Sequence, residues 1–124
     1  MLNSRWHILL WFAYLLWLVC ASLTPLDISL DVRHGDKLLH GLAYFFMAML
    51  YPWPLVRHGR VFIFVVLTIL GSFIELLQSV LPVNRTGDIK DILANSLGII
   101  LGLLVLWIFQ TTAYKEKYSN NKIK

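Results

Sequence analysis

Apolar residues occur along this chain in four long runs, separated by short segments that are rich in polar and charged residues. A helix of about 20 apolar residues is long enough to cross the roughly 30 Å hydrocarbon core of a bilayer. In runs of this length, even β-branched and aromatic residues indicate a membrane helix. We therefore predict an all-α integral membrane bundle of four transmembrane helices. Their expected ranges are residues 6–23, 38–55, 61–81 and 89–109.

The composition supports a membrane protein. The 124 residues are 58% hydrophobic and 15% charged, whereas soluble domains carry about 25% charged residues. A soluble domain of this length would bury only about two thirds of its surface, which is too little to hide so many apolar side chains. The length indicates a single domain. We place it at residues 1–113 and expect a mobile, basic, cytoplasmic tail at residues 114–124.

The formal net charge of +4 comes from basic residues at the ends of the apolar runs and in the tail. Membrane topology requires this distribution, so we expect no nucleic-acid partner. Lys and Arg residues number seven in the segments on one side of the predicted membrane and four on the other. Because positive residues favour the cytoplasm, both termini should be cytoplasmic and the first and third loops should face outward. Cys20 is the only cysteine, which excludes an internal disulfide and a cysteine-based metal site.

Polar and ionisable residues gather near one end of three of the predicted helices. In the predicted topology, the second helix begins, the third ends and the fourth begins at the outward face. The polar residues of these three ends and of the turn after the third helix should therefore lie at the same side of the membrane. They are Asp36, Lys37, His40, Tyr44, Glu75, Gln78, Arg85, Asp88, Asp91 and Asn95.

The spacing of these residues places them on single helical faces. In the second helix, Asp36, His40 and Tyr44 repeat every four residues, which aligns them on one side. The polar stripe of the fourth helix continues into Gly98-x-x-x-Gly102, a spacing of small residues that lets two helices approach closely. We therefore expect the polar faces to point toward each other and not toward lipid.

A charged residue at the centre of a bilayer costs about 3 kcal/mol on insertion scales, and intramembrane ionisable residues usually line a site. The ten polar and ionisable residues named above are more than the packing of four helices needs. We therefore favour a functional site over a purely structural role in holding the helices together.

These residues are compatible with several kinds of site. In the kind that we favour, Lys37 and Arg85 bind a polar or anionic headgroup, since a guanidinium suits bidentate contact with phosphate or carboxylate. In the second kind, His40, Glu75 or Asp91 is the acid or base of a membrane-embedded enzyme. The other candidate ligand contacts are Tyr44, Gln78, Asp88 and Asn95.

Metal binding is the third kind of site, with mixed nitrogen and oxygen ligands. The candidate ligands are His40, Glu75, Asp88 and Asp91. The sequence contains no H-E-x-x-H motif, so we expect neither a metal nor a cofactor. It also contains no G-x-S-x-G, P-loop or dinucleotide motif, and common soluble-enzyme chemistries therefore have no support.

In their order and spacing, these residues resemble the VanZ-like family of bacterial membrane proteins. The matching set is Asp36-Lys37-x-x-His40-x-x-x-Tyr44, then Glu75-x-x-Gln78, then Arg85-x-x-Asp88-x-x-Asp91-x-x-x-Asn95-x-x-Gly98-x-x-x-Gly102. It extends over residues 36–102. One departure is Gly41, where such proteins often have a bulky aromatic residue. We expect looser packing beside His40 as a result.

The resemblance implies a multi-pass protein of the bacterial inner (plasma) membrane. The family's namesake is associated with low-level resistance to the glycopeptide teicoplanin. We therefore expect this cell-envelope protein to hold a membrane lipid or a lipid-linked cell-wall precursor at its outward-facing polar site. An enzyme acting on a lipid headgroup and a structural or assembly factor are the alternatives, and the oligomeric state stays open.

Overall fold

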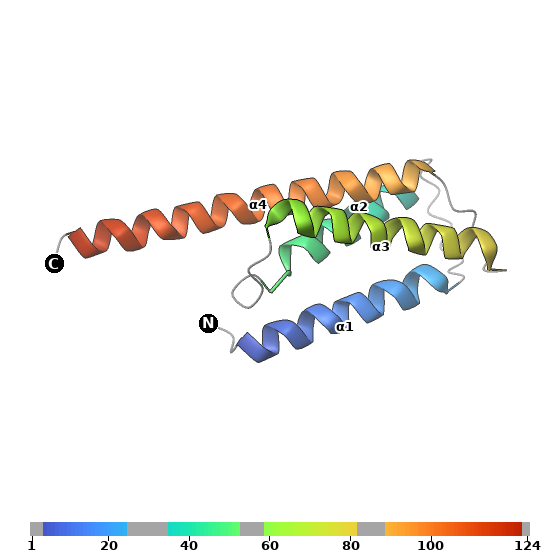
Figure 1. Cartoon of the computed structure of the whole chain (residues 1–124), viewed down its shortest axis with the longest axis horizontal. Helices are drawn as coiled ribbons and strands as arrows, with labels where there is room; N and C mark the ends of the chain where they lie inside the picture. The colour runs from blue at the N-terminus through green and yellow to red at the C-terminus, as the bar shows by residue number, and fades with distance from the viewer. Residues whose placement is uncertain (1–3, 25–34, 53–58, 82–88, 123–124) are drawn as a thin grey trace.

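The structure, a computed structural model, describes residues 4–24, 35–52, 59–81 and 89–122, and this part of the chain is helical apart from short helix ends (Figure 1). Its elements are α1 (Ser4–Leu23), α2 (Gly35–Met49), α3 (Arg60–Val80) and α4 (Ile89–Lys122). The all-α fold class is therefore confirmed, as is the presence of a helix in each of the four apolar runs.

Three of the described helices, α1, α3 and α4, are long and apolar enough to cross a membrane. At 1.5 Å per residue, α1 and α3 are each about 30 Å long and α4 is about 50 Å long. Helix α2 has 15 residues and is about 22 Å long, which is less than the hydrocarbon thickness. A membrane span by α2 therefore stays a prediction.

Helix α2 begins and ends earlier than its apolar run suggests. It starts at Gly35 and stops at Met49, whereas we expected residues 38–55. The early start includes Asp36, whose carboxylate lies in the first turn, where the helix dipole favours negative charge. The early end follows from Pro52, because proline has no backbone N–H and its ring disfavours helical conformation in the residue before it.

Helix α4 is longer than its apolar run. We expected it to end at residue 109 and a mobile tail to follow, but the helix continues through Lys122. The extension contains no glycine and no proline, and several of its residues are good helix formers. The hydroxyl of Thr112 donates a hydrogen bond to the Ile108 carbonyl one turn earlier, at 3.0 Å, and so satisfies its polar group within the helix.

Helices α2 and α4 pack more closely than any other pair, and glycines make this possible. A Cβ atom added at Gly98 would overlap the backbone carbonyl of Gly41, and one added at Gly102 would overlap the carbonyl of Phe45. Even at Gly41 itself, a Cβ would lie only 3.4 Å from the Ala94 carbonyl oxygen. Our expectation of loose packing at Gly41 is therefore wrong, because Gly41 lies at the close crossing of the two helices.

The core lies between α2, α3 and α4. Its largest fully buried apolar side chains are Met47, Ile63, Leu67 and Ile99, each no more than 1% exposed. Helix α1 packs on α2 and α3, as Figure 1 shows, and two aromatic side chains anchor it there. The Trp11 indole N–H donates to the Met47 carbonyl at 3.0 Å. The Tyr14 hydroxyl donates to the Ala43 carbonyl at 2.9 Å.

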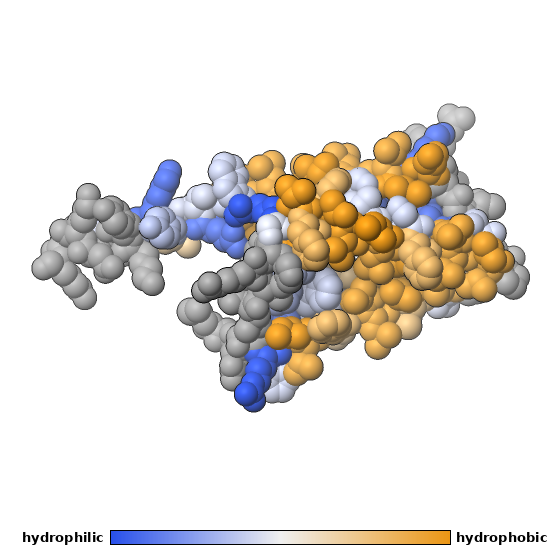
Figure 2. Space-filling model, viewed as in Figure 1, coloured by the Kyte–Doolittle hydropathy of each residue, from blue (hydrophilic) through white to orange (hydrophobic). Residues whose placement is uncertain are grey.

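The outer surface of the described helices is strongly apolar. Figure 2 shows a largely hydrophobic surface over the packed part of the helices, with hydrophilic residues near the start of α1 and on α4 where it extends past the other helices. Trp17, Val61, Phe73 and Leu97 are each more than half exposed, although their side chains are large and apolar. Soluble proteins do not expose contiguous apolar surface on this scale. Lipid is therefore the solvent of this surface.

Candidate functional site

The polar residues that begin α2, end α3 and begin α4 lie at one end of the helix bundle. Figure 1 shows these three helix ends together, with the end of α1 beside them. The start of α1 and the end of α4 lie at the opposite end. The up-and-down path of the chain therefore brings together side chains that are more than 50 residues apart in the sequence.

An ion pair joins α2 to α4 at this end. The Lys37 ammonium lies 3.3 Å from Oδ1 of Asp91 and donates a hydrogen bond to it. The Asp91 side chain is only 6% exposed, while that of Lys37 is 33% exposed. The carboxylate is thus held inside the bundle and the lysine reaches it from the rim.

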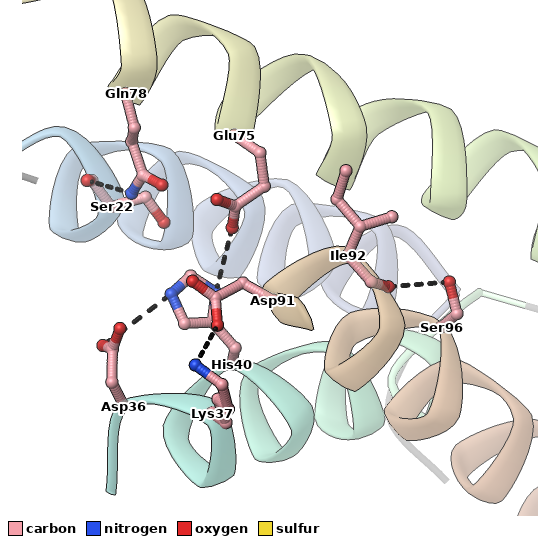
Figure 3. A network of polar contacts seen from close by, with 9 residues as sticks. All are labelled: Ser22, Asp36, Lys37, His40, Glu75, Gln78, Asp91, Ile92 and Ser96. Atoms are coloured by element: carbon pink, nitrogen blue, oxygen red, sulfur yellow. Dashed lines mark hydrogen bonds and ion pairs between the residues drawn. The ribbon is translucent and has the colours of Figure 1, made fainter. Parts of the chain in front are cut away.

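His40 lies between two carboxylates from different helices (Figure 3). Its Nε2 atom is 3.8 Å from Oδ1 of Asp36, one turn earlier on α2. Its Nδ1 atom is 3.5 Å from Oε1 of Glu75 on α3. The imidazole therefore connects an exposed carboxylate with a buried one, because the Asp36 side chain is 62% exposed and the Glu75 side chain only 4%.

Tyr44 and Asn95 lie deeper, where α2 and α4 face Gly71 of α3. A Cβ added at Gly71 would lie 3.2 Å from the Tyr44 hydroxyl oxygen and 3.3 Å from Nδ2 of Asn95. The absence of a side chain at Gly71 therefore makes room for both groups. Both residues are 2% exposed. Within the described part of the chain, neither the Tyr44 hydroxyl nor the Asn95 amide has a hydrogen-bond partner.

Gln78 is buried but takes no part in the contacts around His40. Its amide Nε2 donates to the backbone carbonyl of Ser22 at 2.7 Å, as Figure 3 shows, and so ties α3 to the end of α1. The partner on α1 is a backbone atom, so no side-chain pattern in that helix indicates the contact. Arg85 and Asp88, two further candidates, lie outside the described residues.

One cluster of described residues has the composition of a metal site. The donor atoms of Asp36, His40 and Asp91 all lie within 4.8 Å of one another. Asp36 was not among the expected metal ligands, because its side chain joins this group only through the fold. The Lys37 ammonium already supplies a positive charge to Asp91 at 3.3 Å. We therefore assign no metal to this cluster.

An apolar groove lies at the other end of α3 and α4. It is lined by Arg60, Val61, Phe64, Ile100, Leu103, Leu104 and Trp107. Its polar boundary is Arg60, whose guanidinium donates to the Gln110 side chain at 3.0 Å. The groove contains none of the candidate site residues, and surrounding lipid is suited to fill it.

Comparison with known proteins identifies the family. The family model described as VanZ/LLP1 matches residues 4–110, which covers all three helix ends of the polar site. The chain belongs to the VanZ/LLP1 family. No curated protein and no solved structure gave a match. The resemblance carried by the polar residues and glycines is thereby confirmed, and this VanZ/LLP1 protein is a membrane protein.

Proposed function

We propose that this VanZ/LLP1 protein binds the polar headgroup of an envelope lipid or of a lipid-linked cell-wall precursor at the cluster of Lys37, His40, Glu75 and Asp91. The observation that carries the proposal is the burial of two carboxylates beside two basic side chains. As whole residues, Glu75 is 3% exposed and Asp91 is 4% exposed. Buried charged groups lower stability unless they are paired. A role in binding explains why the bundle contains them.

The charges of the cluster favour a ligand with both acceptor and donor groups. Lys37 is one-third exposed, so its ammonium can turn from Asp91 toward a phosphate or carboxylate at the rim. Asp91 would then accept hydrogen bonds from hydroxyl or amine groups of the same headgroup. We infer from the sequence that Arg85 supplies a second anion contact, because its guanidinium suits bidentate binding. Tyr44 and Asn95 would line the inner wall.

We propose that the site faces outward from the bacterial inner membrane and that both termini are cytoplasmic. The excess of Lys and Arg at the opposite end of the bundle supports this orientation. A headgroup in the outer leaflet would then meet the site directly. If the bound headgroup belongs to a cell-wall precursor, expression of the protein should change susceptibility to teicoplanin, the phenotype associated with the family's namesake.

The arrangement of His40 favours one alternative, an enzyme acting on a lipid headgroup. An imidazole that contacts a carboxylate through each ring nitrogen is suited to accept and return protons. A structural or assembly factor is the other alternative, in which the Lys37–Asp91 pair serves only to join α2 and α4. The three proposals differ in what the purified protein does to a lipid.

Native mass spectrometry of the protein with labelled envelope lipids separates these proposals. We expect the wild type to retain a lipid without converting it. Lys37→Met should reduce retention about tenfold, since a charge-assisted hydrogen bond contributes about 1.5 kcal/mol or more. Ser96→Ala is the control, because among the described residues the Ser96 hydroxyl bonds only within α4, to the Ile92 carbonyl at 2.8 Å.

Each other outcome selects an alternative. If the wild type converts the lipid to a product of altered mass and His40→Gln does not, the protein is an enzyme. Equal lipid retention by wild type and Lys37→Met, together with a lower thermal stability of the variant, would leave only the structural role.

A further inference from the structure

Three ionisable side chains at the polar end form a row of decreasing exposure. The Asp36 side chain is 62% exposed, that of His40 is 10% and that of Glu75 is 4%. Each ring nitrogen of His40 faces one of the carboxylates, at 3.8 Å and 3.5 Å (Figure 3). Both distances exceed a hydrogen bond by less than about 1 Å, so small side-chain rotations close them.

Polar groups continue from Glu75 into the interior of the bundle. The next buried polar side chain is that of Tyr44, one turn beyond His40 on α2. The Tyr44 hydroxyl and the Asn95 amide lie beside Gly71, one turn from Glu75 on α3. Another turn away is the buried hydroxyl oxygen of Thr68, which also lacks a hydrogen-bond partner among the described residues. Glu75 and Thr68 are about 10 Å apart along the helix axis.

The polar row stops in the middle of the bundle. Beyond Thr68 lie the fully buried apolar side chains of Met47, Ile63 and Leu67. A continuous polar path therefore leads from the site end only as far as the core. Buried polar groups without a protein partner are usually hydrogen-bonded to ordered water. Tyr44 and Asn95 lie close to Gly71, so the space around Gly71 does not admit a large ligand.

We propose that Glu75 is a buried proton-binding site that exchanges protons with the aqueous face through His40. In the inward step, Nε2 of His40 takes a proton from the protonated Asp36 carboxyl group, which faces the acidic solvent. The Nδ1–H proton passes to Oε1 of Glu75. The step leaves Asp36 as a carboxylate, His40 as the neutral tautomer with its proton on Nε2, and Glu75 as a neutral acid. The reverse transfer releases the proton.

The other charged groups around this path do not interrupt it. Helix α2 also contributes Lys37 and the Tyr44 hydroxyl, and α4 contributes Asp91. The Lys37 ammonium lies against Asp91, so these two charges largely cancel beside His40. In the described part of α1, Arg5 and His7 lie at the opposite end of the helix, the Tyr14 hydroxyl donates to the Ala43 carbonyl, and Cys20 is exposed. His40 is therefore the group through which the surface and Glu75 communicate.

This activity goes beyond headgroup binding and depends on different geometry. It requires the two contacts of His40, and it does not require that any lipid binds. It would give the site a proton supply from one side of the membrane only. A wild-type protein that retains lipid but never protonates Glu75 would refute the proton path and leave the proposed function intact. A wild-type protein that protonates Glu75 but retains no lipid would refute only the proposed function.

The test is a rapid change from alkaline to acidic buffer, followed by infrared spectroscopy of the protein in lipid nanodiscs. In the wild type, we expect the carbonyl band of a protonated carboxylic acid to appear. The band should be absent in Glu75→Gln, which assigns it to Glu75. His40→Gln should slow its appearance by about tenfold or more, because positioned proton-transfer groups contribute at least this much.

Two further variants complete the experiment. His7→Gln makes the same chemical change at the opposite end of α1 and should leave the rate unchanged. Asp36→Asn alters an exposed side chain, so the fold should persist even if His40→Gln does not fold. Asp36→Asn should slow the appearance of the band severalfold, since protons from the solvent replace the lost carboxyl group only in part. An absent band in the wild type, or equal rates in the wild type and Asp36→Asn, would overturn the proposal.

Discussion

Glu75 and Asp91 are carboxylates in a part of the molecule where burial strongly disfavours charge. Each lies beside a basic side chain from α2, and the two basic residues differ in what they offer. Lys37 has a permanent positive charge and a flexible stem that reaches Asp91 from the rim. His40 offers two ring nitrogens and connects Glu75 with the exposed Asp36. Lys37 and Asp91 therefore form the ion pair of the site, while His40, Asp36 and Glu75 form the proposed proton path beside it.

Replacement of Lys37 tests the ion pair. Lys37→Met leaves the Asp91 carboxylate buried without its ammonium, so we expect the free energy of unfolding to fall by about 2 kcal/mol. Because a neutral amide needs no counter-charge, Asp91→Asn in the Lys37→Met background should recover part of this loss. Thermal unfolding in detergent measures both effects.

Lys115→Met is the matched control for this prediction, because Lys115 is exposed near the end of α4. It should change stability by less than about 0.5 kcal/mol. A Lys37→Met protein as stable as this control would show that the ion pair does not stabilise the fold.

The contact of α2 with α4 determines where the site residues meet. Gly41 and Gly98 let the two backbones touch. Gly41 lies one turn beyond Lys37 on α2, directly after His40, and Gly98 lies two turns beyond Asp91 on α4. The separation of the helices at this crossing sets the distance between Lys37 and Asp91. The same close approach brings Tyr44 and Asn95 to Gly71 of α3. The glycines are therefore structural elements of the site, although they carry no chemistry.

Substitution of a single glycine tests this dependence. In Gly98→Ala, the new Cβ would overlap the Gly41 carbonyl, so the helices must separate. We expect a loss of about 1–3 kcal/mol in stability, and also a loss of lipid retention in the native mass spectrum. Gly59→Ala is the control, because a Cβ at Gly59 meets no atom within 4 Å. Equal stability of the two variants would contradict the close crossing.

The whole molecule is polarised along its long axis. One end carries the acidic and basic side chains of the site, and the other carries the start of α1 and the end of α4 (Figure 1). Residues 112–115 are exposed, so this part of α4 contributes little to packing. The lysines in the last turns of α4 add positive charge at the end that we expect to be cytoplasmic. These turns should therefore matter more for orientation than for stability.

Truncation after Ala113 separates orientation from stability. It removes four lysines and leaves three Lys and Arg residues at that end against four at the other. We expect thermal stability to change little, while part of the population inserts in the reverse orientation. Alkaline phosphatase fused to the C-terminus should be inactive on the full chain and partly active on the truncated one. An active fusion on the full chain would reverse the proposed topology.

Much of this protein was predictable because membrane helices depend on local sequence. An uninterrupted apolar run must form a helix in lipid, since each backbone group needs a partner within the segment. The helix in each of the four apolar runs and the family both followed from this pattern and from the spacing of polar residues. The ends were less predictable, because α2 stops before Pro52 while α4 continues beyond its apolar run. Helix ends depend on individual residues as well as on hydropathy.

The sequence alone determined that this is an all-helical membrane protein of the VanZ-like type, with polar residues gathered at the ends of three helices. Only the tertiary structure decided which of them touch. Lys37 pairs with Asp91, His40 lies between Asp36 and Glu75, and Gln78 turns away toward α1. Spacing along a chain determines the face and depth of a residue. The partner across the bundle depends on how closely the helices approach and how they are rotated, and both are set by packing at glycines.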